Sequence, residues 1–303
     1  MNSVTRKGIV LAGGSGTRLH PLTLACSKQL LPIYDKPLVY YPLSVLMLAG
    51  IKEILIITTP DDQASFKRLL GDGGPWGISI EYAVQPEPRG LADAYIVADA
   101  FLDGSPSAMV LGDNLFFGHG FTEMLHTACM SDVPTIFSSH VSDPHRFGIV
   151  EIDGDDKVVS IEEKPQNPKS NNAVTGLYFF NAEAPAIARQ VEPSLRGEIE
   201  ITSIIQHYLD RRHLRLQQLH RGFAWLDAGT HASLSDAGEF VQTLQQRQGL
   251  LVCSPDEIAF NMGFITLDEL ETNADKLSKS SYGLALKAVV QDRRSKANHD
   301  RQN

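Results

Sequence analysis

A glycine-rich segment near the start of the chain has the composition of a phosphate-binding loop. Gly13, Gly14 and Gly16 follow directly on the apolar residues 8–11. Glycines at this point let backbone N–H groups approach a phosphate without obstruction by a Cβ atom. Arg18 adds a guanidinium group, whose fixed geometry suits two phosphate oxygens at once. By itself, the segment is also compatible with a structural turn between a strand and a helix.

Two well-known phosphate motifs do not fit this segment. A dinucleotide-binding fingerprint has a third glycine where this chain has Leu19. A Walker loop has Gly-Lys-Ser/Thr, where this chain has Gly16-Thr17-Arg18. No acidic residue that would match a ribose contact is evident, which disfavours an NAD-dependent oxidoreductase.

Two aspartates stand where carboxylates can act on phosphates. Asp113 follows the apolar run 107–111, and functional groups of open α/β sheets lie at such strand ends. Asp227 lies in the segment Trp225-Leu226-Asp227-Ala228-Gly229-Thr230. Carboxylates bind Mg²⁺, which takes oxygen ligands together with substrate phosphates. Each aspartate is equally suited to cap a following helix.

The elements that must position these residues alternate along the first half of the chain. Strands are predicted at 8–11, 54–58, 78–84 and 107–111, and helices at 42–49, 61–70 and 91–102. Strands that are nearly all apolar and are separated by helices predict a parallel sheet covered on both faces. A ligand crevice is then expected at the carboxyl ends of the strands.

The second half differs in pattern. A hairpin is predicted from 148–153 and 157–161, a further strand at 174–180, and helices at 184–189, 199–211 and 233–248. Residues 254–290 have a helical, amphipathic pattern, and the last dozen residues are polar and expected to fray. We therefore predict an α/β fold, with a Rossmann-like mixed, mainly parallel sheet flanked by helices and a helical C-terminal segment.

Composition narrows the class of protein. The chain of 303 residues carries a net charge of −9, which disfavours a nucleic-acid binder. Its three cysteines are far apart, which favours reduced thiols over a disulfide framework. Neither a signal peptide nor an apolar run of about 20 residues is present. We expect a cytoplasmic protein without a membrane partner.

Taken together, the motifs resemble those of the sugar-1-phosphate nucleotidylyltransferases. In segments 11–19, 21–23 and 27–32, Lys28 follows Arg18 by ten residues, as in that family's signature. Segments 35–37, 40–43 and 46–51 are similar to the short bacterial thymidylyltransferases of the rhamnose pathway. The hexapeptide repeat of a C-terminal β-helix is missing. The resemblance extends from Gly8 to about Pro255.

The resemblance implies a Mg²⁺-dependent transfer of dTMP from dTTP to α-D-glucose 1-phosphate, which yields dTDP-glucose and pyrophosphate. The sugar phosphate would attack the α-phosphate directly and in line. Arg18 and Lys28 would bind the triphosphate, and Lys164 would align the attacking phosphate. The metal would be held by Asp113 and Asp227.

The resemblance also implies two binding surfaces. The nucleotide is expected at Leu11, Ala12, Gly13, Gly14, Ser15, Gly16, Thr17, Gln85, Gly90 and Asp113. The sugar phosphate is expected at Phe147, Gly148, Glu163, Lys164, Val174 and Arg196. Phe147 replaces a frequent tyrosine, so a hydrogen bond from a tyrosine hydroxyl is not expected there.

The base is expected at Gln85 and Gly90, since a glutamine carboxamide can both donate to and accept from a pyrimidine edge. Arg89 stands where an aspartate is usual, and Asp93 where a glutamine is usual, which leaves thymine and uracil open. The alternatives are therefore a uridylyltransferase, an enzyme that accepts both dTTP and UTP, and a non-catalytic nucleotide-sugar-binding regulator. The presence of both cations and both aspartates disfavours the regulator.

Related enzymes have a second, regulatory nucleotide site at a subunit interface. This chain keeps Gly118, Glu123, Arg221 and Glu257 of that site. It has changes at Phe117, Thr122, His220 and Asn261, where tyrosine, histidine, glycine and arginine are common. We expect altered or weakened feedback by the end-product nucleotide sugar, and by resemblance a homotetramer.

The predicted domain organisation follows from these assignments. Residues 1–250 form the nucleotidyltransferase domain, with a nucleotide-binding half at about 1–115 and a sugar-binding half at about 116–230. Residues 251–290 form the helical C-terminal segment, and 291–303 are expected to be a disordered tail.

Overall fold

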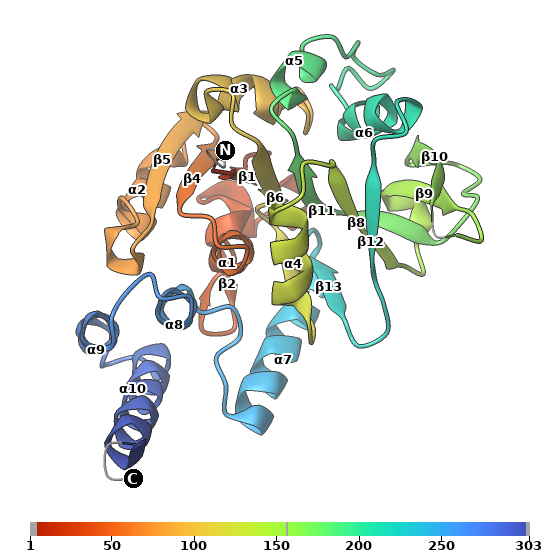
Figure 1. The fold of residues 1–303 in the computed structure, drawn as a ribbon. Coiled ribbons are helices and arrows are strands. Elements are labelled where there is room, and N and C mark those ends of the chain that lie inside the picture. Colours follow the sequence, from red (N-terminus) through yellow and green to blue (C-terminus); the bar gives the residue numbers. More distant parts are fainter. Residues whose placement is uncertain (1–4, 156, 301–303) are drawn as a thin grey trace.

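The computed structural model describes residues 5–155 and 157–300. Its centre is a sheet with the parallel strands β6 (Ser107–Leu111), β1 (Lys7–Ala12), β4 (Glu53–Thr58) and β5 (Ser79–Val84), in that order (Figure 1). The predicted parallel strands are confirmed. Their apolar side chains alternate between two hydrophobic clusters, one on each face of the sheet.

The sheet continues with antiparallel strands. β11 (Asn172–Phe180) pairs with β6, with β8 (Thr135–His140) and with β9 (Gly148–Ile152). β9 forms the predicted hairpin with β10 (Val158–Glu163), and β12 (Arg215–Leu219) pairs in parallel with β8. The sheet is therefore mixed and mainly parallel in its nucleotide half, as predicted, although β8 and β12 were not predicted.

Helices cover both faces of the sheet (Figure 1). The cluster on one face contains side chains from α1 (Tyr40–Leu48), α2 (Gln63–Leu70) and α4 (Phe121–Cys129). The cluster on the other face contains side chains from α3 (Asp93–Leu102), α5 (Ala184–Ala188) and α6 (Ile201–Asp210). Because both faces are covered, the carboxyl ends of the strands are the part of the sheet left open to a ligand.

A separate two-stranded ladder lies beside the sheet. β7 (Asn114–Phe117) pairs antiparallel with β13 (Ala224–Asp227), and the register places Asp227 opposite Asn114. A second small ladder joins β2 (Pro32–Ile33) to β3 (Lys36–Pro37). Short 3₁₀ turns are found at Thr17–Leu19, Leu22–Leu24, Lys28–Leu30, Gly74–Trp76 and Pro144–Arg146.

The C-terminal part is helical, as predicted. α7 (His231–Gln248) begins at a capping box in which Thr230 and Ser233 exchange hydrogen bonds. It is followed by α8 (Pro255–Asn261), α9 (Leu267–Lys276) and α10 (Ser281–Asp300). α10 extends through residues 291–300 of the segment expected to be a tail, and 301–303 lie outside the described residues. Arg294 supports this extension through ion pairs with Asp268 and Glu271 on α9.

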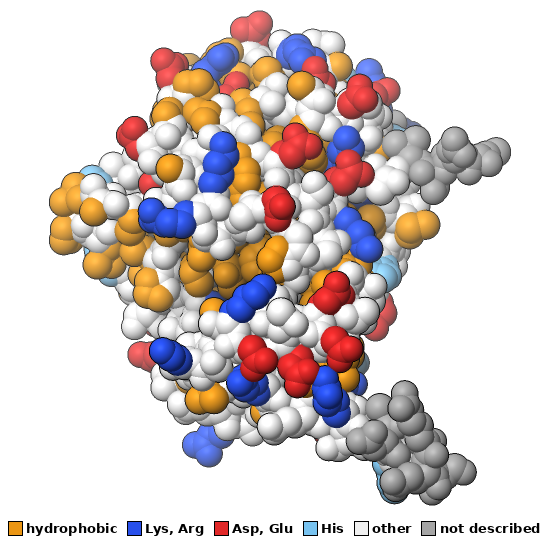
Figure 2. All heavy atoms as spheres, turned by 90° about the vertical axis from the view of Figure 1, so that its left-hand side faces the viewer, with side chains coloured by type: hydrophobic (Ala, Val, Ile, Leu, Met, Phe, Trp, Pro, Cys, Tyr) orange, Lys and Arg blue, Asp and Glu red, His pale blue; other side chains and the backbone are white. Residues whose placement is uncertain are grey.

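Acidic and basic side chains are interspersed on the face that contains β5 and α2 (Figure 2). Hydrophobic side chains lie between the charged ones and do not form one continuous patch on this face. Among the helices of the described residues, none is both long enough and apolar enough to cross a membrane.

Candidate active site

Three adjoining cavities form a cleft at the carboxyl ends of the parallel strands. Their volumes are about 210, 260 and 430 Å³, and Lys28 and Asp113 line all three. Gly13 and Gly14 line the first and third cavities, and Arg18 lines the second and third. Because the cavities share these residues, we treat them as one cleft with a base end, a phosphate end and a sugar end.

The glycine-rich loop leaves β1 at the floor of the cleft. Gly14 has a φ of +100° and Gly16 a φ of +60°, a backbone region that other residues rarely adopt. The Thr23 hydroxyl donates to the Gly16 carbonyl oxygen at 2.7 Å, and the Gln29 amide donates to the Gly13 carbonyl oxygen at 3.2 Å. These two contacts hold the loop by its carbonyl groups, so its conformation is fixed from the side of Thr23 and Gln29.

Arg18 and Lys28 lie on the same side of the phosphate end but differ in environment. Arg18 is exposed, and within the described residues its guanidinium has no ion-pair partner. Lys28 is half-buried, and its Nζ lies 2.5 Å from Asp113 Oδ2. Burial raises the pKa of Asp113, but the Lys28 ammonium and hydrogen bonds from Lys28 and Asn114 outweigh it, so the pKa is lowered overall.

Asp227 reaches the same cavity as Asp113 from the end of β13. Its Oδ2 accepts a hydrogen bond from Arg146 at 2.6 Å. Burial raises the pKa of Asp227; Arg146 opposes this rise, but the nearby Asp113 charge adds to it. The Ala228 N–H also donates to the Asp113 carbonyl oxygen at 3.0 Å. The two aspartates, more than a hundred residues apart in sequence, therefore meet at one point.

This pair of carboxylates fits a divalent cation that shares its ligands with a substrate. Asp113 and Asp227 line one cavity together with Arg18 and Lys28. Mg²⁺ is typically bound by one or two carboxylates plus phosphate oxygens and water. Across the described residues, no cluster of three or more His, Cys, Asp or Glu side chains is close enough to hold a metal by itself. The remaining ligands would then come from phosphates and water.

The base end of the cleft contains both residues predicted to bind the base. Gln85 follows β5 and is buried, and Gly90 has a φ of +112°. A Cβ at Gly90 would stand 2.4 Å from the Ile199 carbonyl oxygen, so the close approach of these two backbones requires glycine. Leu11 also lines this end, whereas Ala12 is fully buried in β1 and does not line the cleft.

The sugar end brings together most of the residues predicted for the sugar phosphate. Phe147, Gly148, Glu163, Lys164 and Val174 line the cavity of 430 Å³. Arg196 does not line it. Its guanidinium is instead paired with Glu200 at 2.7 Å, Glu163 at 3.3 Å and Glu198 at 3.4 Å.

Sequence reasoning missed two residues that organise the cleft. Arg146 holds Asp227 and lies over the ring of Phe147, with 5.3 Å between the guanidinium carbon and the ring centroid. Asn114 donates to Asp113 at 2.8 Å, and its Oδ1 accepts from the Trp225 indole at 2.6 Å and from the Gly176 N–H at 3.1 Å. Arg146 and Asn114 each adjoin a predicted residue in the sequence, and this adjacency was the one sign of a functional role that the sequence offered.

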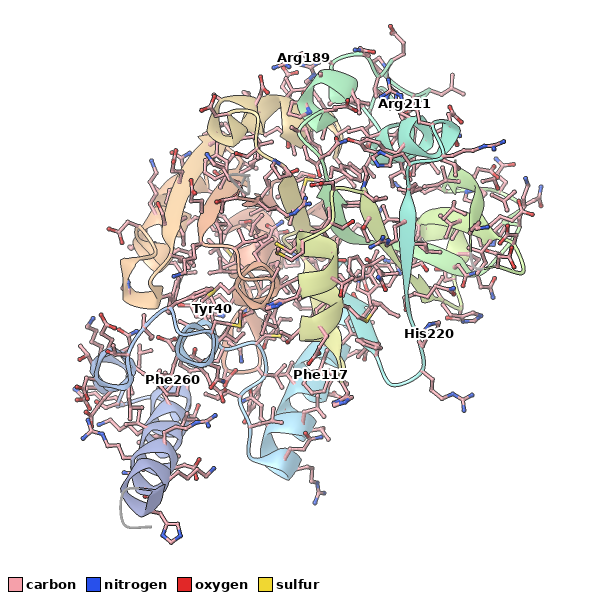
Figure 3. The ribbon with its side chains drawn as sticks, viewed as in Figure 1. Tyr40, Phe117, Arg189, Arg211, His220 and Phe260 are labelled. Atoms are coloured by element: carbon pink, nitrogen blue, oxygen red, sulfur yellow. The ribbon has the colours of Figure 1, made fainter. Side chains whose placement is uncertain are left out.

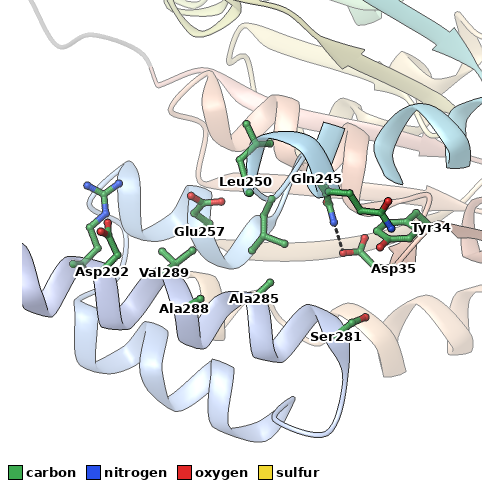
Figure 4. A pocket seen from close by; sticks show the side chains of 14 residues that line it. Tyr34, Asp35, Gln245, Leu250, Glu257, Ser281, Ala285, Ala288, Val289 and Asp292 are labelled. Atoms are coloured by element: carbon green, nitrogen blue, oxygen red, sulfur yellow. Dashed lines mark hydrogen bonds between the residues drawn. The ribbon is translucent and has the colours of Figure 1, made fainter. Parts of the chain in front are cut away.

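The residues predicted for a regulatory site are spread over several elements. Figure 3 shows Phe117 beside α7 and His220 on the loop between β12 and β13, and Asn261 is the last residue of α8. Gly118 packs so closely on Phe223 that a Cβ there would stand 2.2 Å from the ring. Of the four residues kept from that site, Glu257 lines a second large cavity of about 460 Å³ among α7, α8 and α10 (Figure 4). Glu123 and Arg221 lie on α4 and on the β12–β13 loop.

Known proteins match this chain over most of its length. The family model described as nucleotidyl transferase matches residues 7–243. A glucose-1-phosphate thymidylyltransferase of Xanthomonas campestris pv. campestris (strain B100) is 56% identical over 286 residues, covering 94% of this chain and 97% of the relative. A protein of the same name from Neisseria meningitidis is 54% identical, covering 91% of this chain and 96% of the relative.

Solved structures agree with these relatives. A candidate glucose-1-phosphate thymidylyltransferase from Bacillus anthracis, in complex with a sucrose, aligns with a TM-score of 0.72 at 36% identity, covering 78% of this chain and 95% of that chain. A UDP-glucose pyrophosphorylase with UDP-glucose shares the fold with a TM-score of 0.71 at 22% identity, covering 79% of this chain and 99% of that chain. The family match, the relatives and the cleft lead to one conclusion: this chain belongs to the nucleotidyl transferase family and is a nucleotidyltransferase.

Proposed function

We propose that this chain transfers dTMP from dTTP to α-D-glucose 1-phosphate and releases dTDP-glucose and pyrophosphate. The single observation that carries the proposal is the 56% identity, over nearly the full length of both chains, to a protein named for this reaction. The cleft supports it, because cations, carboxylates and a sugar-sized cavity adjoin one another.

The chemistry of this reaction needs little from a general base. A sugar phosphate is already an anionic oxygen nucleophile near neutral pH. Its oxygen forms a bond to the α-phosphorus of dTTP, the bond from that phosphorus to the bridging oxygen breaks, and pyrophosphate leaves with the electron pair. The protein must therefore position the two phosphates and neutralise their charge.

Arg18 and Lys28 are proposed to bind the triphosphate and the departing pyrophosphate. Arg18 is exposed at the phosphate end, which leaves its guanidinium open to two phosphate oxygens. Lys28, now paired with Asp113, would lie between that carboxylate and the incoming phosphates. Lys164 is proposed to align the sugar phosphate. It extends from the end of β10 beside Glu163, which accepts hydrogen bonds well and suits sugar hydroxyls.

Mg²⁺ is the proposed metal, held by Asp113 and Asp227. When bound, it would supply positive charge that neutralises part of the negative charge on the phosphates. Lys28 and Arg146 each hold one of these carboxylates in place, so both carboxylates are oriented in advance. The residues themselves thus keep two oxygen ligands facing the phosphate end.

A second candidate is an enzyme that accepts UTP as well as dTTP. The observation in its favour is that Gln85 and Gly90 line the base end, and both are proposed to contact the edge that thymine and uracil share. The two bases differ by a methyl group, and a hydrophobic pocket separates such ligands by about 1–3 kcal/mol.

The test is a matrix of initial rates for dTTP, UTP and other nucleoside triphosphates against several sugar 1-phosphates, followed through pyrophosphate release. We expect the highest kcat/KM for dTTP with glucose 1-phosphate. A highest value for UTP would favour the second candidate. Pyrophosphate release from none of the pairs would overturn the proposal and favour a binding regulator.

We also propose a cytoplasmic homotetramer with a nucleotide-binding half at 1–115 and a sugar-binding half at 116–230. Gly118, Glu123, Arg221 and Glu257 are proposed as the remainder of a regulatory site with weakened feedback. The changes at Phe117, Thr122, His220 and Asn261 support the weakening. Strong inhibition by dTDP-rhamnose in a steady-state assay would contradict it.

A further inference from the structure

Asp93 has a buried carboxylate that bonds to Gln85, a residue of the base end. It is the first residue of α3 and is 4% exposed. One of its oxygens, Oδ2, lies 2.8 Å from Gln85 Nε2, and the other lies 3.9 Å from the guanidinium of Arg89. Each of the two carboxylate oxygens of Asp93 therefore lies nearest to a nitrogen-bearing side chain.

The carboxylate determines which way the Gln85 side chain faces. An ionised carboxylate has no proton and can only accept hydrogen bonds, so the amide nitrogen of Gln85 must face it. The Gly90 carbonyl oxygen accepts a hydrogen bond from the same nitrogen at 3.3 Å, so it favours the same orientation of the Gln85 carboxamide. The alternative orientation would bring the Gln85 oxygen against Asp93, with two acceptors facing each other.

Because the nitrogen and the oxygen belong to one planar carboxamide, the orientation of the Gln85 nitrogen also determines where the Gln85 oxygen lies. Gln85 Oε1 lies against the glycine-rich loop, since a Cβ on Gly13 would stand 3.3 Å from it. Gln85 and Gly13 both line the base end of the cleft. Within the described residues, no side-chain donor bonds to this oxygen. The base end therefore presents an acceptor.

We propose that Asp93 is a positioning residue that sets base specificity through Gln85. By holding the carboxamide oxygen toward the cavity, it selects a base that offers an N–H donor, as thymine and uracil do at N3. Cytosine offers an unprotonated nitrogen there and is rejected because two acceptors would meet. The inference rests on the proposed function and deepens it, and it treats dTTP and UTP alike.

The test compares dTTP, UTP and dCTP in the full-length protein carrying D93N. An asparagine can turn either an oxygen or a nitrogen toward Gln85, so the carboxamide is free to rotate. We expect the ratio of kcat/KM for dTTP over that for dCTP to fall about tenfold. UTP should follow dTTP. The new asparagine could keep its own oxygen toward Gln85 and so preserve the orientation of the carboxamide. Asp93→Leu, which has no polar group, removes this possibility.

Two controls separate this role from a structural one. D99N, on the same helix, removes a carboxylate that pairs with Arg189 at the surface and should leave the ratio unchanged. In a Gln85→Ala background, D93N should have no further effect on the ratio, since Asp93 acts through Gln85. A loss of folding would appear as a lower Tm without a change in base preference.

The inference is overturned if D93N and Asp93→Leu both keep the dTTP-to-dCTP ratio within about twofold of the wild type. An equal effect of D93N with and without Gln85 would also overturn it. The same ratio is measured by calorimetric binding of dTTP and dCTP. Wild-type binding without turnover would contradict the proposed function while still testing the inference.

Discussion

The candidate active-site cleft and the C-terminal cavity are similar in size but differ in chemistry. The C-terminal cavity, at about 460 Å³, is at least as large as any part of the cleft. Figure 4 shows Ala285, Ala288 and Val289 of α10 facing Gln245 across it, with Gln245 bonded to Asp35 at 2.9 Å. Asp35 and Gln245 also bond to Lys36, and Arg293 bonds to Asn261. In the cleft, by contrast, Arg18 is unpaired among the described residues, and two carboxylates of different segments converge.

This comparison indicates that volume alone does not identify the reactive site. The cleft concentrates groups that would each be costly without a partner: two close carboxylates and an exposed glycine-rich backbone. A triphosphate and a divalent cation would satisfy them together. The C-terminal cavity is lined by apolar side chains of α10 on one side and by polar and charged side chains elsewhere, and within the described residues no two of its carboxylates are brought together by an ion pair to a shared cation. The two regions should therefore respond very differently to the same kinds of perturbation.

Removal of divalent cations should have the largest effect. Asp113 and Asp227 would keep only Lys28 and Arg146 as partners, and the phosphates would lose the cation that neutralises part of their charge. We expect pyrophosphate release to stop in EDTA and to return on addition of excess Mg²⁺. D113N should show the same loss without recovery. Full activity of D113N with Mg²⁺ would reduce Asp113 to a structural role.

Arg18→Ala should have the next largest effect. Loss of one preorganised donor to a reacting group typically lowers kcat about 100- to 1000-fold. Since Arg18 is exposed and has no ion pair among the described residues, the Tm should stay unchanged. Arg68→Ala, at an exposed site on α2, is the matched control and should keep full activity. An active Arg18→Ala enzyme would remove the arginine from the mechanism.

Filling the C-terminal cavity should have little effect on turnover. Ala288 faces this cavity from α10, and a leucine there would occupy part of it. We expect kcat and the KM for dTTP to remain within about twofold of the wild type, as for surface substitutions away from the site. A larger change, measured at saturating glucose 1-phosphate, would show that the two cavities are coupled.

The smallest effect concerns the pH dependence of stability. Burial raises the pKa of Glu257, although Arg293 and Asn261 oppose the rise. For a carboxyl whose folded pKa is raised, the stability contribution is present below the unfolded pKa and is lost as pH rises through the folded pKa. Glu257→Gln should therefore gain most over the wild type at pH 7 in urea unfolding. The difference should shrink as the pH falls through that raised pKa toward the usual pKa of a glutamate; a constant difference over this range would contradict it.

Much of the fold was predictable because its strands are almost wholly apolar. Segments such as residues 54–58 and 107–111 have patterns that only a doubly covered parallel strand explains well. β8 and β12 were missed for the opposite reason. Thr135–His140 and Arg215–Leu219 mix polar and apolar residues, and their pairing is set by long-range contacts rather than by local pattern.

The residues of the candidate site that belong to a sequence motif were predictable. Those that only the fold brings to the site were not. Arg18, Lys28 and Asp113 were indicated by position relative to a strand and by the family signature. Arg196 was expected at the sugar, but three neighbouring glutamates hold its guanidinium. Arg146 was missed because its partner, Asp227, is contributed by a distant strand. Such ion pairs depend on geometry that no local pattern encodes.

The ladder between β7 and β13 has a consequence for how this chain tolerates insertions and deletions. Its register places Asp227 opposite Asn114, next to Asp113. Because side chains alternate along a strand, one extra residue within Ala224–Asp227 would turn Asp227 to the other face and separate the two carboxylates. The connection at 220–223 is different, since doubling the length of a loop costs only about 0.6 kcal/mol. We therefore expect the chain to tolerate insertions and deletions at 220–223 but not within Ala224–Asp227.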